Sequence, residues 1–140
     1  GQWPVAGSRM TAGFDPPAQD WLAGHRGVDF AALPGTPVRA VAAGVVAFAG
    51  PVAGRPVVVV RLPDGRRTTY EPVRALVGVG EQVAAGATLG VVVDRAGSDP
   101  DPAGGRHCAS GCLHLGLRTA TGYADPLSLL TRPPAVLKPL

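Results

Sequence analysis

Short apolar runs separated by turn residues extend along most of the chain. Runs rich in valine, many of them with alternating polar positions, lie at VDFAA (28–32), PVRAVAAGVVAFAG (37–50), RPVVVVRL (55–62), RRTTYEPV (66–73), EQVAAGATLGVVV (81–93) and CLHLGLR (112–118). β-branched side chains at a period of two favour strands, and glycine and proline between the runs favour turns. The pattern predicts an all-β fold, a compact sandwich or antiparallel sheet.

Three local signals refine this picture. Asp64-Gly65 suits a tight hairpin between two of the predicted strands. A faint repeat relates GTPV, followed by GVV, over 35–46 to GEQV, followed by GVV, over 80–92. It predicts two similar β-units packed against each other. Asp125-Pro126 predicts a short C-terminal helix over ADPLSLL (124–130).

The chain divides into three parts by composition. Residues 1–24 predict an irregular N-terminal segment, packed on the core by Trp3, Phe14 and Trp21. Residues 25–130 predict one domain that includes a loop at 94–106, and residues 131–140 a proline-rich tail. The first residues, GQWPVAG, suggest the start of a mature domain without a signal peptide.

Composition and charge narrow the possible functions. The chain has 140 residues, which is enough for one core, and 46% of them are hydrophobic. Twenty glycines and fifteen prolines disfavour helices. The net charge is +3 and the twelve arginines are scattered without interleaved aromatics, which argues against nucleic-acid binding. No apolar run is long enough to span a membrane.

The candidate chemistry lies in HCASGCLHLGL (107–117), which holds two of the three histidines and both cysteines, and in HRGVD (25–29). On a strand, residues two or four apart share a face. His25 and Asp29 would then point the same way, and so would Cys112 and His114. Two histidines and a carboxylate with an open position outline a hydrolytic zinc site, although a simple His–Asp hydrogen bond is the commoner reading of the first pair.

Several segments together resemble one known family. GHRGVDFAALPGTPVRAVAAGVVAFAG (24–50), VGVGEQVAAGATLG (77–90), CLHL (112–115) and the late Asp125-Pro126 occur in the order seen in LytM/lysostaphin-type zinc metalloendopeptidases, which cut peptidoglycan peptides. The resemblance implies the LytM-type β-fold with its duplicated hybrid motif. It implies one zinc ion on His25, Asp29 and His114, and an extracytoplasmic location, in the cell envelope or secreted.

The same resemblance implies a degenerate active site. The positions of the family's two catalytic histidines fall on Cys112 and Pro72. Because a general acid or base contributes about 10²–10⁴-fold to a rate, this favours a regulatory domain that binds peptidoglycan or a cell-wall hydrolase. The alternative is an active metalloendopeptidase with Glu71 or His107 as an altered base. Strand alternation would point Glu71 away from the side that Pro72 faces, unless the proline disturbs the register.

Two fates are open to Cys112. It can pair with Cys108 and close the small loop CASGC, as is common in oxidising compartments. It can instead remain reduced and become a fourth zinc ligand, which would close the coordination shell. We expect the disulfide, and either fate argues against ordinary turnover.

Overall fold

The computed structural model describes residues 3–5, 10–12, 27–93 and 111–130. These form eleven strands and one short helix: β1 (Met10–Ala12), β2 (Gly27–Ala31), β3 (Pro37–Arg39), β4 (Gly44–Val52), β5 (Arg55–Arg61), β6 (Arg67–Glu71), β7 (Val73–Ala75), β8 (Gln82–Val83), β9 (Thr88–Val92), β10 (Cys112–Thr119), β11 (Gly122–Ala124) and the 3-10 helix η2 (Pro126–Leu129). The predicted all-β fold is confirmed.

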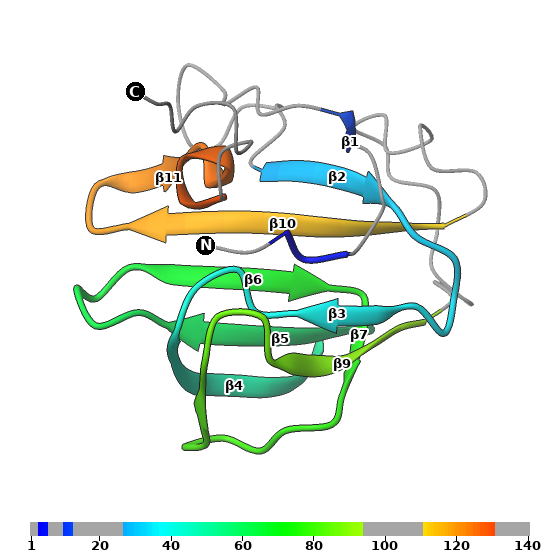
Figure 1. The fold of residues 1–140 in the computed structure, drawn as a ribbon, viewed down its shortest axis with the longest axis horizontal. Helices are drawn as coiled ribbons and strands as arrows, with labels where there is room; N and C mark the ends of the chain where they lie inside the picture. The colour runs from blue at the N-terminus through cyan, green and yellow to red at the C-terminus, as the bar shows by residue number, and fades with distance from the viewer. Residues whose placement is uncertain (1–2, 6–9, 13–26, 94–110, 131–140) are drawn as a thin grey trace, which may run out of the picture.

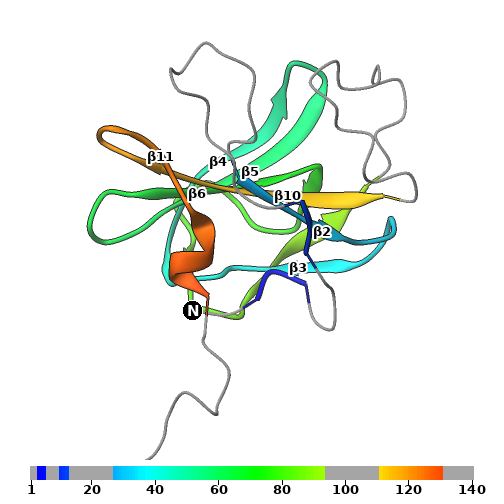
Figure 2. The same cartoon turned by 90° about the horizontal axis from the view of Figure 1, so that it is seen from above.

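The strands form two antiparallel sheets (Figures 1 and 2). The large sheet has the order β1-β2-β10-β6-β5-β4-β8, with β11 beside β10, and the small sheet has the order β3-β9-β7. Apolar side chains between the sheets form one core, in which Phe30, Leu113 and Leu115 are fully buried. Alternation along the same strands puts Asp29 and His114 on the opposite face of the large sheet.

The faint sequence repeat corresponds to a reciprocal pairing of strands. Val38 of the first unit lies opposite Gly90 of the second, while Gly44 of the first lies opposite Val83 of the second. Each unit therefore gives one strand to each sheet, which confirms the prediction that the two units pack together.

The ends of the fold differ in detail from the prediction. The sequence indicated no strand within residues 1–24, but β1 pairs with β2. Trp3 packs edge-to-face on Phe30, with ring centroids 5.7 Å apart. The predicted C-terminal helix is a single 3-10 turn, in which the carboxylate of Asp125 accepts a hydrogen bond from the Leu127 amide at 2.9 Å.

Other predictions fall on parts of the chain outside the described residues: the packing of Phe14 and Trp21, the loop at 94–106 and the tail at 131–140. Within the described ranges, no helix has the length and apolar character needed to cross a membrane.

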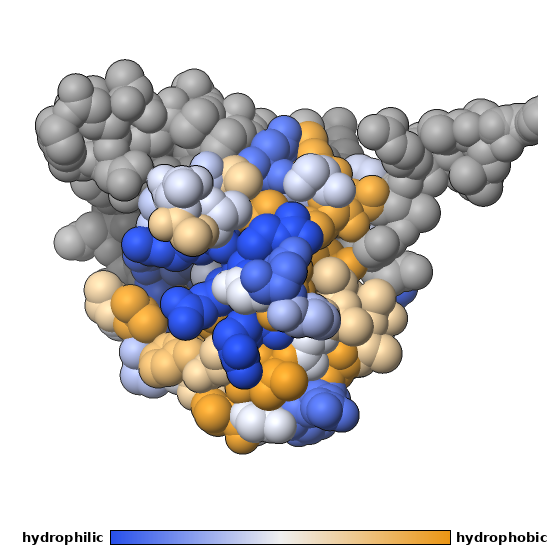
Figure 3. Space-filling view, turned by 90° about the vertical axis from the view of Figure 1, so that its left-hand side faces the viewer, coloured by the Kyte–Doolittle hydropathy of each residue, from blue (hydrophilic) through white to orange (hydrophobic). Residues whose placement is uncertain are grey.

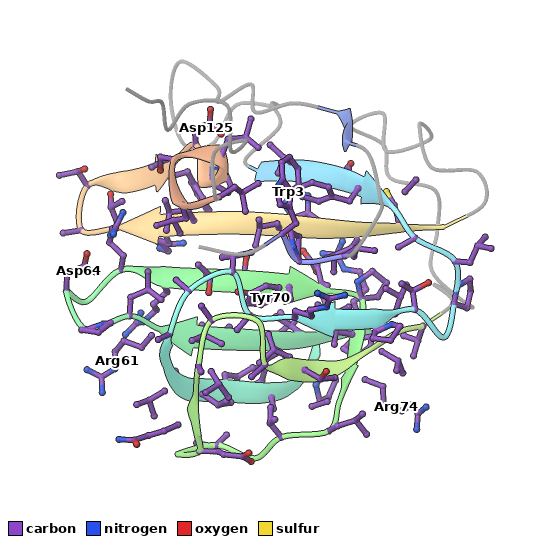
Figure 4. All side chains as sticks on the ribbon, in the orientation of Figure 1. Trp3, Arg61, Asp64, Tyr70, Arg74 and Asp125 are labelled. Carbon is purple, nitrogen blue, oxygen red and sulfur yellow. The ribbon has the colours of Figure 1, made fainter. Side chains whose placement is uncertain are left out.

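Tyr70 links strand β6 to the segment between β3 and β4 (Figure 4). Its side chain is fully buried, and its hydroxyl oxygen accepts a hydrogen bond from the Val41 amide at 3.0 Å. Burial raises the pKa of the phenol from 10.0 to about 12. The neutral form is therefore the one that the folded protein favours.

This predicts an alkaline loss of stability. The contribution of Tyr70 is complete below pH 10, the unfolded pKa, and is lost as the pH rises through the folded value of about 12. Two pKa units correspond to about 3 kcal/mol. Urea titrations at pH 8, 10 and 12 should show this loss in the native protein. Tyr70→Phe should cost about 1–3 kcal/mol at pH 8 by leaving the Val41 amide unpaired, and should lack the alkaline loss. Parallel pH curves for the two proteins would contradict the prediction.

Candidate metal centre

Three strands bring three ionisable side chains into one row. In the registers of β10 with β2 and with β6, His114 lies directly opposite Asp29 on one side and Glu71 on the other. Directly opposed residues in an antiparallel sheet point to the same face, with Cβ atoms about 5 Å apart. The three side chains therefore share the face of the large sheet that is turned away from the core.

Asp29 and His114 are in direct contact. The Nδ1 atom of His114 lies 2.7 Å from Oδ1 of Asp29, which is the distance of a strong hydrogen bond. Asp29 is only 5% exposed, whereas the side chain of His114 is 28% exposed. The flanking residues Val28, Leu113 and Leu115 are completely buried, and they fix the backbone that aims both groups at the same point.

Steric contacts explain why position 27, in the HRGVD segment, is a glycine. A Cβ atom built there would collide with the Leu115 carbonyl oxygen and lie 2.8 Å from Nε2 and 2.9 Å from Cε1 of His114. The ring of His114 occupies the space that any side chain at position 27 would need. The glycine thus permits both the close approach of β2 to β10 and the placement of the imidazole.

The two positions where the resemblance implies catalytic histidines carry other groups. Cys112 lies opposite Ala31, on the same face as His114, and its sulfur is disulfide-bonded. Pro72 is buried. Neither a disulfide sulfur nor a proline ring can transfer a proton at neutral pH.

The expectation for the orientation of Glu71 was wrong. Glu71, the last residue of β6, shares the face of His114, and Pro72, which follows the strand, is buried. The error came from assuming that position 72 faces the site, whereas Pro72 is on the buried side. The carboxylate Oε1 of Glu71 lies 3.6 Å from Nε of Arg55, a partner that the sequence analysis did not identify.

The remaining candidates, His25, His107 and Cys108, lie outside the described residues. Consistent with this, the described part of the chain contains no group of three His, Cys, Asp or Glu side chains that could hold a metal ion. It contains two of the three predicted ligands, Asp29 and His114, already in contact.

Curated relatives occur in mycobacteria. The chain is 45% identical over 132 residues to the uncharacterized protein Rv2891 of Mycobacterium tuberculosis, covering 91% of this chain and 49% of that protein. It is 34% identical over 108 residues to the uncharacterized protein Rv3786c of the same species, covering 76% of this chain and 24% of that protein. The chain thus spans about half or less of the length of these relatives.

Solved structures share the fold. The antimicrobial peptidase lysostaphin from Staphylococcus simulans matches with a TM-score of 0.70 and 26% identity, over 92% of this chain and 52% of that chain. A zinc-containing peptidase from Vibrio cholerae matches in fold, with a TM-score of 0.68 and 20% identity over 94% and 39%. The sequence model of Peptidase family M23 matches residues 23–126, so the chain belongs to that family.

Proposed function

We propose that this chain is a cell-envelope domain that holds one zinc ion on His25, Asp29 and His114 and acts by binding peptidoglycan or a hydrolase that works on it. The observation that carries the proposal is the contact of Asp29 with His114 on a face that carries a disulfide at Cys112 and no side chain from Pro72. The ligand pair is retained, and the proton-transfer groups of related peptidases are replaced.

The donor set suits zinc. A carboxylate oxygen and an imidazole nitrogen are among the preferred ligands of this ion, and here they converge on one point from adjacent strands. His25 precedes Asp29 by four residues, the spacing that keeps two side chains on one face of an extended chain. Zinc, when bound, supplies a Lewis acid that lowers the pKa of a bound water to about 7.

The environment of Cys112 supports an extracytoplasmic location. Cys112 is disulfide-bonded, and Cys108 is the other cysteine in the chain. We place the disulfide between these two residues, where it closes the loop CASGC. Disulfides persist in oxidising compartments, which agrees with a domain of the cell envelope or a secreted one.

A second candidate function is an active zinc peptidase that uses Glu71 as its base. One observation favours it, namely the position of Glu71 directly opposite His114 on the metal-binding face. The ion pair with Arg55 holds the carboxylate near this row. His107 was the other candidate for this role, and it lies outside the described residues.

Digestion of purified cross-linked peptidoglycan by the zinc-loaded protein separates the two candidates. The binding function predicts that the protein sediments with peptidoglycan but releases no soluble muropeptides. Release that disappears in His114→Ala and falls at least about 100-fold in Glu71→Gln would instead establish the peptidase, since a positioned base contributes about 10²–10⁴-fold. Neither sedimentation nor release would refute both peptidoglycan binding and the peptidase, and would leave binding to a hydrolase as the first candidate's remaining form.

A further inference from the structure

Three arginines form a second row on the same face of the large sheet. Arg61 of β5 lies opposite Arg67 of β6, and Arg67 lies opposite Arg118 of β10. All three are exposed. The row continues onto Tyr123 of β11, which lies opposite Arg118 and whose ring centroid is 5.1 Å from the Arg118 guanidinium carbon.

No carboxylate of the described residues neutralises this row. The nearby Asp64 is bound to Arg66, with its Oδ2 2.7 Å from the Arg66 Nε. Asp125 caps η2, and Glu71 pairs with Arg55. Figure 3 shows hydrophilic side chains gathered over this end of the molecule, and Figure 4 shows Arg61 and Asp64 there.

Like charges directly opposite each other in a sheet repel. Three adjacent guanidinium groups with no counter-charge among the described side chains therefore form a surface that an anion stabilises. Guanidinium groups bind carboxylates and phosphates through two parallel hydrogen bonds, so the row suits an anion of this kind, and peptidoglycan peptides supply carboxylates.

The distance between the two rows fits a peptide. Arg67 is four residues from Glu71 along β6, and Arg118 is four residues from His114 along β10, so the arginine row runs parallel to the row of Asp29, His114 and Glu71. At about 3.3 Å per residue the separation is about 13 Å. The position between the rows is taken by the small residues Gly116 and Thr69, which lie opposite each other. An extended peptide has the same rise per residue as a strand. It can therefore reach from one row to the other across Gly116 and Thr69.

We propose that the row of Arg61, Arg67 and Arg118 binds a carboxylate of a peptidoglycan peptide, about four residues from the part of that peptide held at Asp29 and His114. The proposal rests on the proposed function, because it names the group that this domain recognises in its partner. It assigns the docking specificity to residues that are distant from the metal centre.

Co-sedimentation with purified peptidoglycan at physiological salt tests this inference. Arg67→Gln, at the centre of the row, is compared with Arg74→Gln, which removes an exposed arginine from β7 at the opposite end of the molecule (Figure 4). We expect Arg67→Gln to weaken binding about fivefold, the effect of one partly screened ion pair, and Arg74→Gln to change it less than twofold. Amidating the carboxyl groups of the peptidoglycan should weaken binding of the native protein at least as much as Arg67→Gln does, and should weaken binding of Arg67→Gln less, because only Arg61 and Arg118 remain in that variant.

The outcomes separate this inference from the function on which it rests. If native protein fails to sediment with peptidoglycan, the proposed binding of peptidoglycan itself is wrong. If it sediments and Arg67→Gln sediments equally well, only the arginine row is refuted. Peptidoglycan stripped of phosphate-bearing polymers by hydrofluoric acid should bind as well as untreated material, and a loss of binding on stripping would overturn the assignment to a carboxylate.

Discussion

Gly27→Ala should lower the free energy of unfolding by about 3 kcal/mol, because the added methyl group has no space. Its Cβ would collide with the carbonyl oxygen of Leu115 and crowd the imidazole of His114. The ring can rotate away, but the carbonyl belongs to a strand that is paired on both sides, so β2 and β10 would have to separate. Overpacking of this kind typically costs about 1–3 kcal/mol, and the backbone contact places this site at the upper end.

Urea denaturation followed by circular dichroism measures the effect. Gly78→Ala is the matched control, because nothing lies within 4 Å of a Cβ at that position. We expect the free energy of unfolding of this control to lie within about 0.5 kcal/mol of that of the native protein. Equal stability of the two variants would mean that β2 does not approach β10 as closely as described here.

Much of the fold follows from local signals in the sequence. The valine-rich runs locate most strands, because a period of two in hydrophobicity directly reflects the two faces of a sheet. The repeat at 35–46 and 80–92 predicted that two similar units pack together, and in the structure they do so by pairing Val38 with Gly90 and Gly44 with Val83. The strand β1 was missed because it has three residues within a segment rich in glycine and proline. Its strand conformation depends on pairing with β2, which no local pattern records.

The site was less predictable, because it depends on register. Spacing predicts which residues of the same strand share a face with Asp29 or with His114. The contact between Asp29 and His114 joins residues 85 positions apart, which spacing cannot predict. The orientation of Glu71 was misjudged since alternation fixes only relative directions, and the absolute direction depends on the pairing with β10. The arginine row was invisible for the same reason: Arg61, Arg67 and Arg118 look scattered along the chain and become neighbours only through two registers.

The largest functional effect is expected for zinc binding. Asp29→Asn and His114→Ala should each weaken zinc affinity at least about 100-fold, since loss of a direct ligand exceeds the 10–100-fold cost of losing a residue that only supports one. Asp29→Asn is the sharper variant, because an amide oxygen can still accept the hydrogen bond from His114 while the ligand charge is gone. Chelator competition gives the affinities, and a thermal scan with and without zinc gives the linked stabilisation.

Glu71→Gln is the control on the same face. Glu71 lies opposite His114 but pairs with Arg55 and is outside the proposed ligand set, so zinc affinity should change less than about threefold. At a zinc concentration 1,000 times the native dissociation constant the native protein should gain about 4 kcal/mol of stability, and the two ligand variants, at least about 100-fold weaker, should gain no more than about 1.4 kcal/mol. If Asp29→Asn keeps the native affinity, the contact of Asp29 with His114 is a structural hydrogen bond, and this face of the sheet does not bind the metal through these residues.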